Sequence, residues 1–163
     1  MPAPRKIVAV CTANICRSPM AAALLRHALA AQPEPVRSIE IISAGVAARA
    51  GDPVSENSVV ALKKVGLDIA GHVSQPLTQQ MLNEATMILC MTESHRAMIR
   101  LQAVPSPKNI FLFREFMPQR GHKEIGDPFG GPLKLYEAAR DEMVEAIPSL
   151  VEFIKTQLAA KPM

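Results

Sequence analysis

The chain has 163 residues and a mass of 17.6 kDa, and its composition is 48% apolar and 20% charged. These proportions are typical of a globular protein and exclude a disordered or fibrous chain. Three cysteines are too few for a disulfide scaffold. The net charge of +3 is compatible with anionic substrates but falls far below the charge of a typical nucleic-acid-binding surface.

The sequence contains no uninterrupted apolar run of about 18 residues, which is the length that a membrane-spanning helix needs. The first residues, 1–6, lead directly into a short apolar run and lack the apolar region of a signal peptide. We therefore expect a cytoplasmic protein without membrane contact, whose cysteines are free thiols.

The first half of the chain predicts a strand at 7–10, a helix at 18–29, a strand at 39–43 and a helix at 54–65. Ser18-Pro19 and Asp52-Pro53 each predict a helix start. Ser and Asp are good N-caps, and Pro suits the first helical position. Gly66 stands where a glycine commonly ends a helix.

The second half predicts a helix at 77–84, a strand at 87–91, a helix at 92–101, a strand at 110–113 and a helix at 133–158. Pro148 is expected to kink or split the last helix. Alternating strands and helices are typical of an α/β protein with a parallel sheet. We expect one three-layer domain over residues 1–163, with a four-stranded parallel sheet flanked by helices.

The segment from Cys11 to Ser18 connects the first predicted strand to the first helix. Ligands of open α/β sheets bind at the carboxyl ends of the strands, and a helix N-terminus offers unpaired N–H groups to an anion. A thiolate at Cys11 is favoured in such a field, and Arg17 carries a planar fork that matches two oxygens of an oxyanion. Ser18 can cap the helix and can also hydrogen-bond the thiolate.

Other phosphate-binding and metal-binding motifs are missing. The sequence has neither a G-x-x-x-x-G-K-[ST] motif nor a G-x-G-x-x-G motif after a strand. Cys11 and Cys16 do not form a C-x-x-C pair, and the four histidines are scattered. We therefore expect neither a metal nor a cofactor.

Cys11 to Arg17 with Ser18-Pro19 resembles the Cys-x5-Arg-Ser motif of the low-molecular-weight protein tyrosine phosphatases, and the resemblance covers nearly the whole chain. The other matching segments are Ser43-Ala44-Gly45, His72-Val73-Ser74, Met91-Thr92 with His95, and Gly126-Asp127-Pro128-Phe129-Gly130-Gly131. The resemblance implies a phosphatase phosphate-binding loop directly after the first strand.

The resemblance also implies a role for each motif residue. Cys11 would attack phosphorus and form a thiophosphate intermediate, Arg17 would hold the phosphoryl oxygens, and Asp127 would be the general acid. The residues implied to bind phosphate are Thr12, Ala13, Asn14, Ile15, Cys16, Arg17 and Ser18.

A second set of residues would support the loop. Asn14, Ser18, Ser43 and His72 resemble the supporting network of the family, in which Asn takes a left-handed conformation. Cys16 resembles the second cysteine, which can pair with the nucleophile under oxidation and protect it. Cys90 lies in a predicted strand and is expected to be an inert core residue.

The resemblance favours phosphotyrosine as the substrate, with Ile15 and Phe129 in the substrate cleft. The alternative is phosphoarginine, since Phe129-Gly130-Gly131 and the segment 72–78 resemble a bacterial branch that includes protein-arginine phosphatases. That subgroup has Thr where this chain has Ile15, and a bulky apolar residue there resembles the tyrosine-specific members.

Two further classes share features of the loop. Arsenate reductases relay a disulfide through later cysteines, whereas this chain has none after Cys90. A phospho-ligand-binding module would have lost the nucleophile or the acid, but Cys11 and Asp127 are both present. We expect phosphorylated proteins as partners, inorganic phosphate as a product, no nucleic-acid partner, and a monomer or weak dimer.

Overall fold

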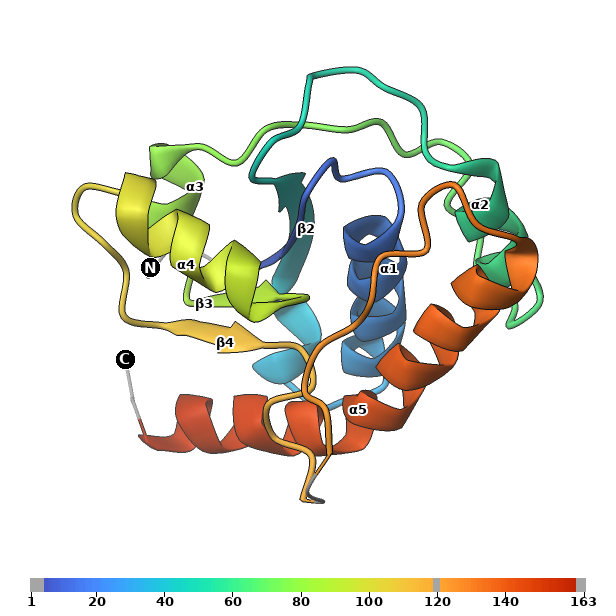
Figure 1. Ribbon diagram of the computed structural model, residues 1–163. Helices are drawn as coiled ribbons and strands as arrows, with labels where there is room; N and C mark the ends of the chain where they lie inside the picture. The colour runs from blue at the N-terminus through green and yellow to red at the C-terminus, as the bar shows by residue number, and fades with distance from the viewer. Residues whose placement is uncertain (1–4, 119–120, 161–163) are drawn as a thin grey trace.

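Four parallel strands form the centre of the protein. The computed structural model describes residues 5–118 and 121–160, and the sheet has the order β2-β1-β3-β4 (Figure 1). The strands are β1 (Lys6–Cys11), β2 (Glu40–Gly45), β3 (Met87–Cys90) and β4 (Ile110–Leu112). The helices are α1 (Arg17–Ala30), α2 (Glu56–Lys63), α3 (Gln79–Glu84), α4 (Glu93–Gln102) and α5 (Leu133–Ala160), with a 3-10 turn η1 (Val36–Ser38) after α1.

Helices cover both faces of the sheet. α1 and α5 pack together on one face with α2 beside them, and α3 and α4 lie on the other (Figure 1). The expected three-layer arrangement with a four-stranded parallel sheet is confirmed. Among the described residues, no helix combines the length and hydropathy needed to cross a bilayer.

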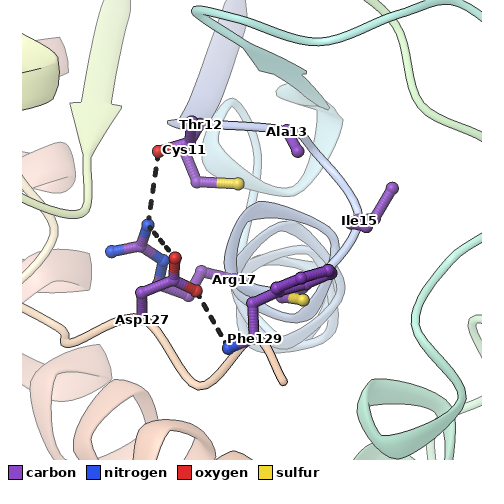
Figure 2. A pocket seen from close by; sticks show the side chains of 8 residues that line it. Cys11, Thr12, Ala13, Ile15, Arg17, Asp127 and Phe129 are labelled. Atoms are coloured by element: carbon purple, nitrogen blue, oxygen red, sulfur yellow. Dashed lines mark hydrogen bonds and ion pairs between the residues drawn. The ribbon is translucent and has the colours of Figure 1, made fainter. Parts of the chain in front are cut away.

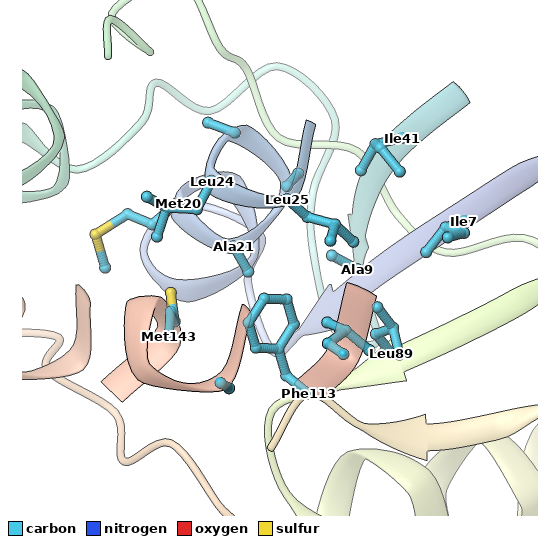
Figure 3. Close-up of a cluster of buried hydrophobic side chains, with 14 of the residues drawn as sticks. Ile7, Ala9, Met20, Ala21, Leu24, Leu25, Ile41, Leu89, Phe113 and Met143 are labelled. Atoms are coloured by element: carbon cyan, nitrogen blue, oxygen red, sulfur yellow. The ribbon is translucent and has the colours of Figure 1, made fainter. Parts of the chain in front are cut away.

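Each strand contributes apolar side chains to both faces, as expected for a parallel sheet that helices cover on both sides. Ile7, Ala9 and Leu89 face the side of α1 and α5, where Phe113 and Met143 complete a buried cluster (Figure 3). A second cluster lies on the side of α3 and α4 and includes Val8, Val10, Ile88, Cys90 and Ile99. This core holds the end of β1 rigidly in place.

Cys90 lies in the second cluster and is fully buried. Burial raises the pKa of its thiol to about 12, because a thiolate loses its hydration there. The expectation that Cys90 is a core residue is confirmed.

Both helix starts that were predicted from proline pairs are wrong. α1 begins one residue before Ser18, and Cys16 takes the cap position without a side-chain cap bond. The Ser18 hydroxyl instead bonds within the loop. α2 begins only at Glu56, because the Asp52 N–H donates to Ser74 Oγ and the next residue is held extended in a bridge to another loop.

Two other local expectations have mixed outcomes. Gly66 does adopt a positive φ of 86° after α2, as a helix-ending glycine should. Pro148 does not split α5, which continues to residue 160 although its ribbon changes direction along its length (Figure 1). Residues 1–4, on which part of the leader-segment expectation rests, lie outside the described residues.

Candidate active site

A five-residue loop joins the last residue of β1, Cys11, to the first residue of α1, Arg17. Cys11 pairs in register with Gly45 at the end of β2. A Cβ built on Gly45 would lie 2.5 Å from the Thr12 carbonyl oxygen and 3.0 Å from the Asn14 nitrogen. Only glycine lets the loop pass this close to the neighbouring strand.

The loop turns its carbonyl groups outward. The Cys11 and Thr12 oxygens accept from the N–H groups of the segment after Gly45 (residues 46 and 47), each at 2.9 Å, and the Ile15 oxygen accepts from Ser55 N at 2.8 Å. Within one planar trans peptide the C=O and the following N–H point in opposite directions. The amides that follow these carbonyls therefore point into the loop, where they form a cradle for an anion.

Asn14 locks this conformation from within. Its φ is +61°, a left-handed value that Asn tolerates better than most residues, and its side chain is fully buried. Nδ2 donates to Ser18 Oγ at 2.7 Å and to Ser43 Oγ at 3.0 Å, while Oδ1 accepts from Gln75 N at 2.9 Å. His72 Nε2 donates to the Asn14 carbonyl at 2.9 Å. The structure thus brings together all four residues expected in the network.

The Cys11 thiol lies at the base of the cradle and is almost fully buried. Its Sγ is 3.0 Å from Ser18 Oγ and 3.4 Å from Ser18 N. A thiolate can only accept, so both Ser18 groups would donate to it, and the N–H belongs to the first turn of α1. Ser18 therefore presents two hydrogen-bond donors to the sulfur that faces the cavity.

Arg17 is buried and its guanidinium is held at both ends. NH1 donates to the Ile125 carbonyl at 2.9 Å. NH2 lies 3.5 Å from Thr12 Oγ1 and 3.8 Å from Asp127 Oδ2. Asp127 is half exposed, and its Oδ1 accepts from Phe129 N at 3.0 Å. The loop after β4 therefore brings a carboxylate to the guanidinium from 110 residues further along the chain.

These groups line a cavity of about 200 Å³. Figure 2 shows Cys11 directed into it, with Arg17 and Asp127 on one side and Ile15 and Phe129 on the other. Its lining residues are Cys11, Thr12, Ala13, Ile15, Cys16, Arg17, Asp127 and Phe129, of which Phe129 is the one aromatic residue. One wall is therefore charged and the other apolar.

Cys16 contributes a second thiol to the same cavity. Burial raises the pKa of this thiol, although hydrogen bonds from Tyr136 and Ser55 oppose the rise. The Tyr136 hydroxyl lies 3.6 Å from Cys16 Sγ and accepts from Ser55 Oγ at 3.1 Å. Both cysteines are free thiols in this structure.

Sequence reasoning missed three residues of the site. Tyr136 lies 120 residues from Cys16, and Ile125 acts through a backbone carbonyl, so no motif marks either of them. His95 was noted only as part of a family segment, yet its Nε2 lies 2.9 Å from Thr12 Oγ1. The sequence places it in the first turn of the helix predicted at 92–101, but no local signal links that helix to Thr12.

Comparisons with known proteins agree with this geometry. The family model described as "Low molecular weight phosphotyrosine protein phosphatase" matches residues 6–160. The chain is 39% identical to a protein-arginine-phosphatase of Geobacillus stearothermophilus, over 94% of this chain and 99% of that protein. It is 35% identical to a probable low molecular weight protein-tyrosine-phosphatase, EpsP, of Ralstonia solanacearum, over 83% of this chain and 86% of that protein.

A solved structure has the same architecture. The YwlE arginine phosphatase from Geobacillus stearothermophilus superposes with a TM-score of 0.83 and 37% sequence identity, covering 98% of this chain and 99% of that chain. The match extends over the strands, the cysteine loop and the final helix. The chain therefore belongs to the low-molecular-weight phosphotyrosine protein phosphatase family, whose members are cysteine-dependent hydrolases.

Proposed function

We propose that this protein hydrolyses phosphotyrosine in protein substrates, with Cys11 as the nucleophile. The Cys11 sulfur attacks phosphorus, the bond from phosphorus to the tyrosyl oxygen breaks, and a thiophosphate forms on the enzyme. Arg17 and the inward amides of the loop bind the non-bridging oxygens as their charge redistributes. The observation that supports this role is the burial of Cys11 inside an anion cradle.

Asp127 is the general acid of the proposed reaction. A phenolate leaving group has a pKa of about 10, so it needs a proton as the bond to phosphorus breaks. The Asp127 carboxyl lies at the cavity, half exposed and beside Arg17. After the tyrosine leaves, the same carboxylate takes a proton from water, which attacks the thiophosphate and releases inorganic phosphate and the Cys11 thiolate.

The apolar wall of the cavity, formed by Ile15 and Phe129, determines which substrate is preferred in this proposal. Ile15 and Phe129 line the side of the cavity opposite Arg17, where they would contact the ring of a phosphotyrosine held over Cys11 (Figure 2). Burying a ring between two apolar side chains is favourable by roughly 25 cal/mol per Å² of apolar surface removed from water. A guanidinium in the same place would lose hydration without a matching apolar gain.

Phosphoarginine is the second candidate, because relatives at 39% and 35% identity are named protein-arginine-phosphatases. The same nucleophile would then attack phosphorus while Asp127 protonates the leaving guanidine nitrogen. Position 15 separates the two candidates, because its side chain belongs to the cavity wall that the leaving group would contact.

The test compares kcat/KM for matched phosphotyrosine and phosphoarginine peptides. We expect the phosphotyrosine peptide to be preferred, and Ile15→Thr to lower that preference by about tenfold through lost ring contact. A preference for phosphoarginine in the unmodified enzyme would contradict the proposed substrate. Hydrolysis retained in Cys11→Ser would contradict the mechanism. Phosphopeptide binding without turnover would identify a binding module instead.

The remaining parts of the proposal concern surroundings and regulation. We propose a cytoplasmic location, because the Cys11 thiolate must stay reduced to act. We also propose a monomer or weak dimer, since this chain by itself supplies the nucleophile, the guanidinium and the carboxylate of the site. Cys16 lines the same cavity as Cys11, which supports a reversible protective disulfide between them under oxidation.

A further inference from the structure

His95 is a buried polar side chain directly behind the phosphate-binding loop. It lies in the first turn of α4, is 3% exposed, and is not one of the residues that line the cavity. Its Nε2 is 2.9 Å from Thr12 Oγ1, although 83 residues separate the two in sequence. Buried polar side chains are nearly always hydrogen-bonded, so the partners of this imidazole indicate its role.

The hydrogen bonds of His95 define its tautomer. Nδ1 lies 3.2 Å from the backbone N of Thr92, and this N–H can only donate, so Nδ1 accepts. Burial and the nearby Arg17 charge lower the pKa of His95 to about 4, which keeps the ring neutral near pH 7. The one ring hydrogen is therefore on Nε2, and it is donated to Thr12 Oγ1.

Thr12 Oγ1 receives a second donor from the cavity side. Arg17 NH2 lies 3.5 Å from it, so the hydroxyl oxygen accepts from both His95 and Arg17. The other end of the guanidinium donates to the Ile125 carbonyl at 2.9 Å. The guanidinium is thus held by one backbone carbonyl, by the Asp127 carboxylate at 3.8 Å and by one hydroxyl that also accepts from His95.

We infer that His95 is a positioning residue that acts through the Thr12 hydroxyl to hold Arg17 in the plane that binds two phosphoryl oxygens. The inference rests on the proposed function only in giving Arg17 an oxyanion to bind. Because both ends of the guanidinium are already held in the free protein, Arg17 loses little conformational freedom when phosphate binds. Phosphate therefore binds more tightly.

A matched pair of variants tests the inference. Asn at position 95 places an amide oxygen where Nδ1 accepts and keeps the α4 cap, but it has no group at the Nε2 position. Gln reaches the Nε2 position with an N–H donor but does not keep the cap acceptor. We expect His95→Asn to weaken inorganic phosphate binding and to lower kcat/KM, each by about tenfold, and His95→Gln to retain both within about twofold. A purely structural role for the cap predicts the reverse order.

A double-mutant cycle shows whether the effect passes through Thr12. Thr12→Val removes the hydroxyl, whereas Thr12→Ser keeps it and is expected to restore phosphate affinity. In the Thr12→Val background, His95→Asn is expected to have no further effect on phosphate affinity. Thr78→Ala, which removes the cap of α3 at a distance from the cavity, controls for general destabilisation.

Three results would overturn the inference. These are an unchanged phosphate affinity in His95→Asn, a full additional loss in the double variant, and a larger loss in His95→Gln than in His95→Asn. Should the His95 variants not fold, unchanged phosphate affinity in Thr12→Val overturns it equally. Phosphate affinity is measured by calorimetry, so an enzyme that binds phosphate without hydrolysing phosphotyrosine would contradict the proposed function alone.

Discussion

Acidification is expected to destabilise the protein through His95. This side chain is buried and neutral in the folded protein, where its pKa is about 4 instead of 6.5. Burial is the main cause and Arg17 adds to it, whereas Asp127 and Glu124 oppose the shift. Between these two pKa values the unfolded chain binds a proton that the folded protein does not. The free energy of unfolding therefore falls as the pH falls.

The size of the effect follows from the two pKa values. Proton linkage gives a loss of about 2 kcal/mol between about pH 7 and about pH 5, and about 3 kcal/mol by about pH 4. That is a large fraction of the stability of a typical domain, which is roughly 5–15 kcal/mol. The loss begins as the pH falls through the unfolded pKa and levels off below the folded one.

Urea unfolding at a series of pH values measures this loss, with His95→Asn as the control. The Asn side chain keeps an acceptor for the α4 cap but does not titrate in this pH range. All other titrating groups are the same in the two proteins, so their contributions cancel in the comparison. The difference in unfolding free energy between the two proteins should shrink by about 2 kcal/mol from about pH 7 to about pH 5. Parallel pH profiles for the two proteins would refute the reasoning.

Two further predictions follow from close contacts of the loop. Gly45→Ala would place a Cβ 2.5 Å from the Thr12 carbonyl oxygen, and the backbone of the loop cannot move away without distorting the site. Urea unfolding should therefore show a loss of about 2–3 kcal/mol in the free energy of unfolding, and kcat/KM should fall. Gly71→Ala, where a Cβ meets nothing within 4 Å, is the control, and equal losses in both variants would contradict this account. Tyr136→Phe removes a hydrogen bond that lowers the pKa of Cys16. The substitution should therefore slow the formation of the disulfide between Cys16 and Cys11 under peroxide by about fivefold. The rate is measured by counting the remaining free thiols over time, and an unchanged rate would contradict this role of Tyr136.

Part of the fold is visible in local sequence patterns. Short apolar runs predicted all four strands, because strands covered by helices on both sides are apolar on both faces. The helix starts at Ser18 and Asp52 were predicted wrongly from the same kind of local signal. At both positions, contacts with other segments replace the expected helix cap. Asn14 and Cys11 hydrogen-bond the Ser18 hydroxyl, and Ser74 Oγ accepts from the Asp52 N–H.

Some features of the candidate site also follow from local sequence, whereas others depend on the fold. By itself, the sequence determined the strand directly before Cys11, the spacing from Cys11 to Arg17 and the family to which the chain belongs, because these properties depend on residues that are neighbours in the chain. Only the tertiary structure decided that His95 and Tyr136 meet this loop, from 83 and 120 residues away. The physical reason is that parallel strands end at the same edge of a sheet, which brings the loops that follow them together whatever their separation in sequence.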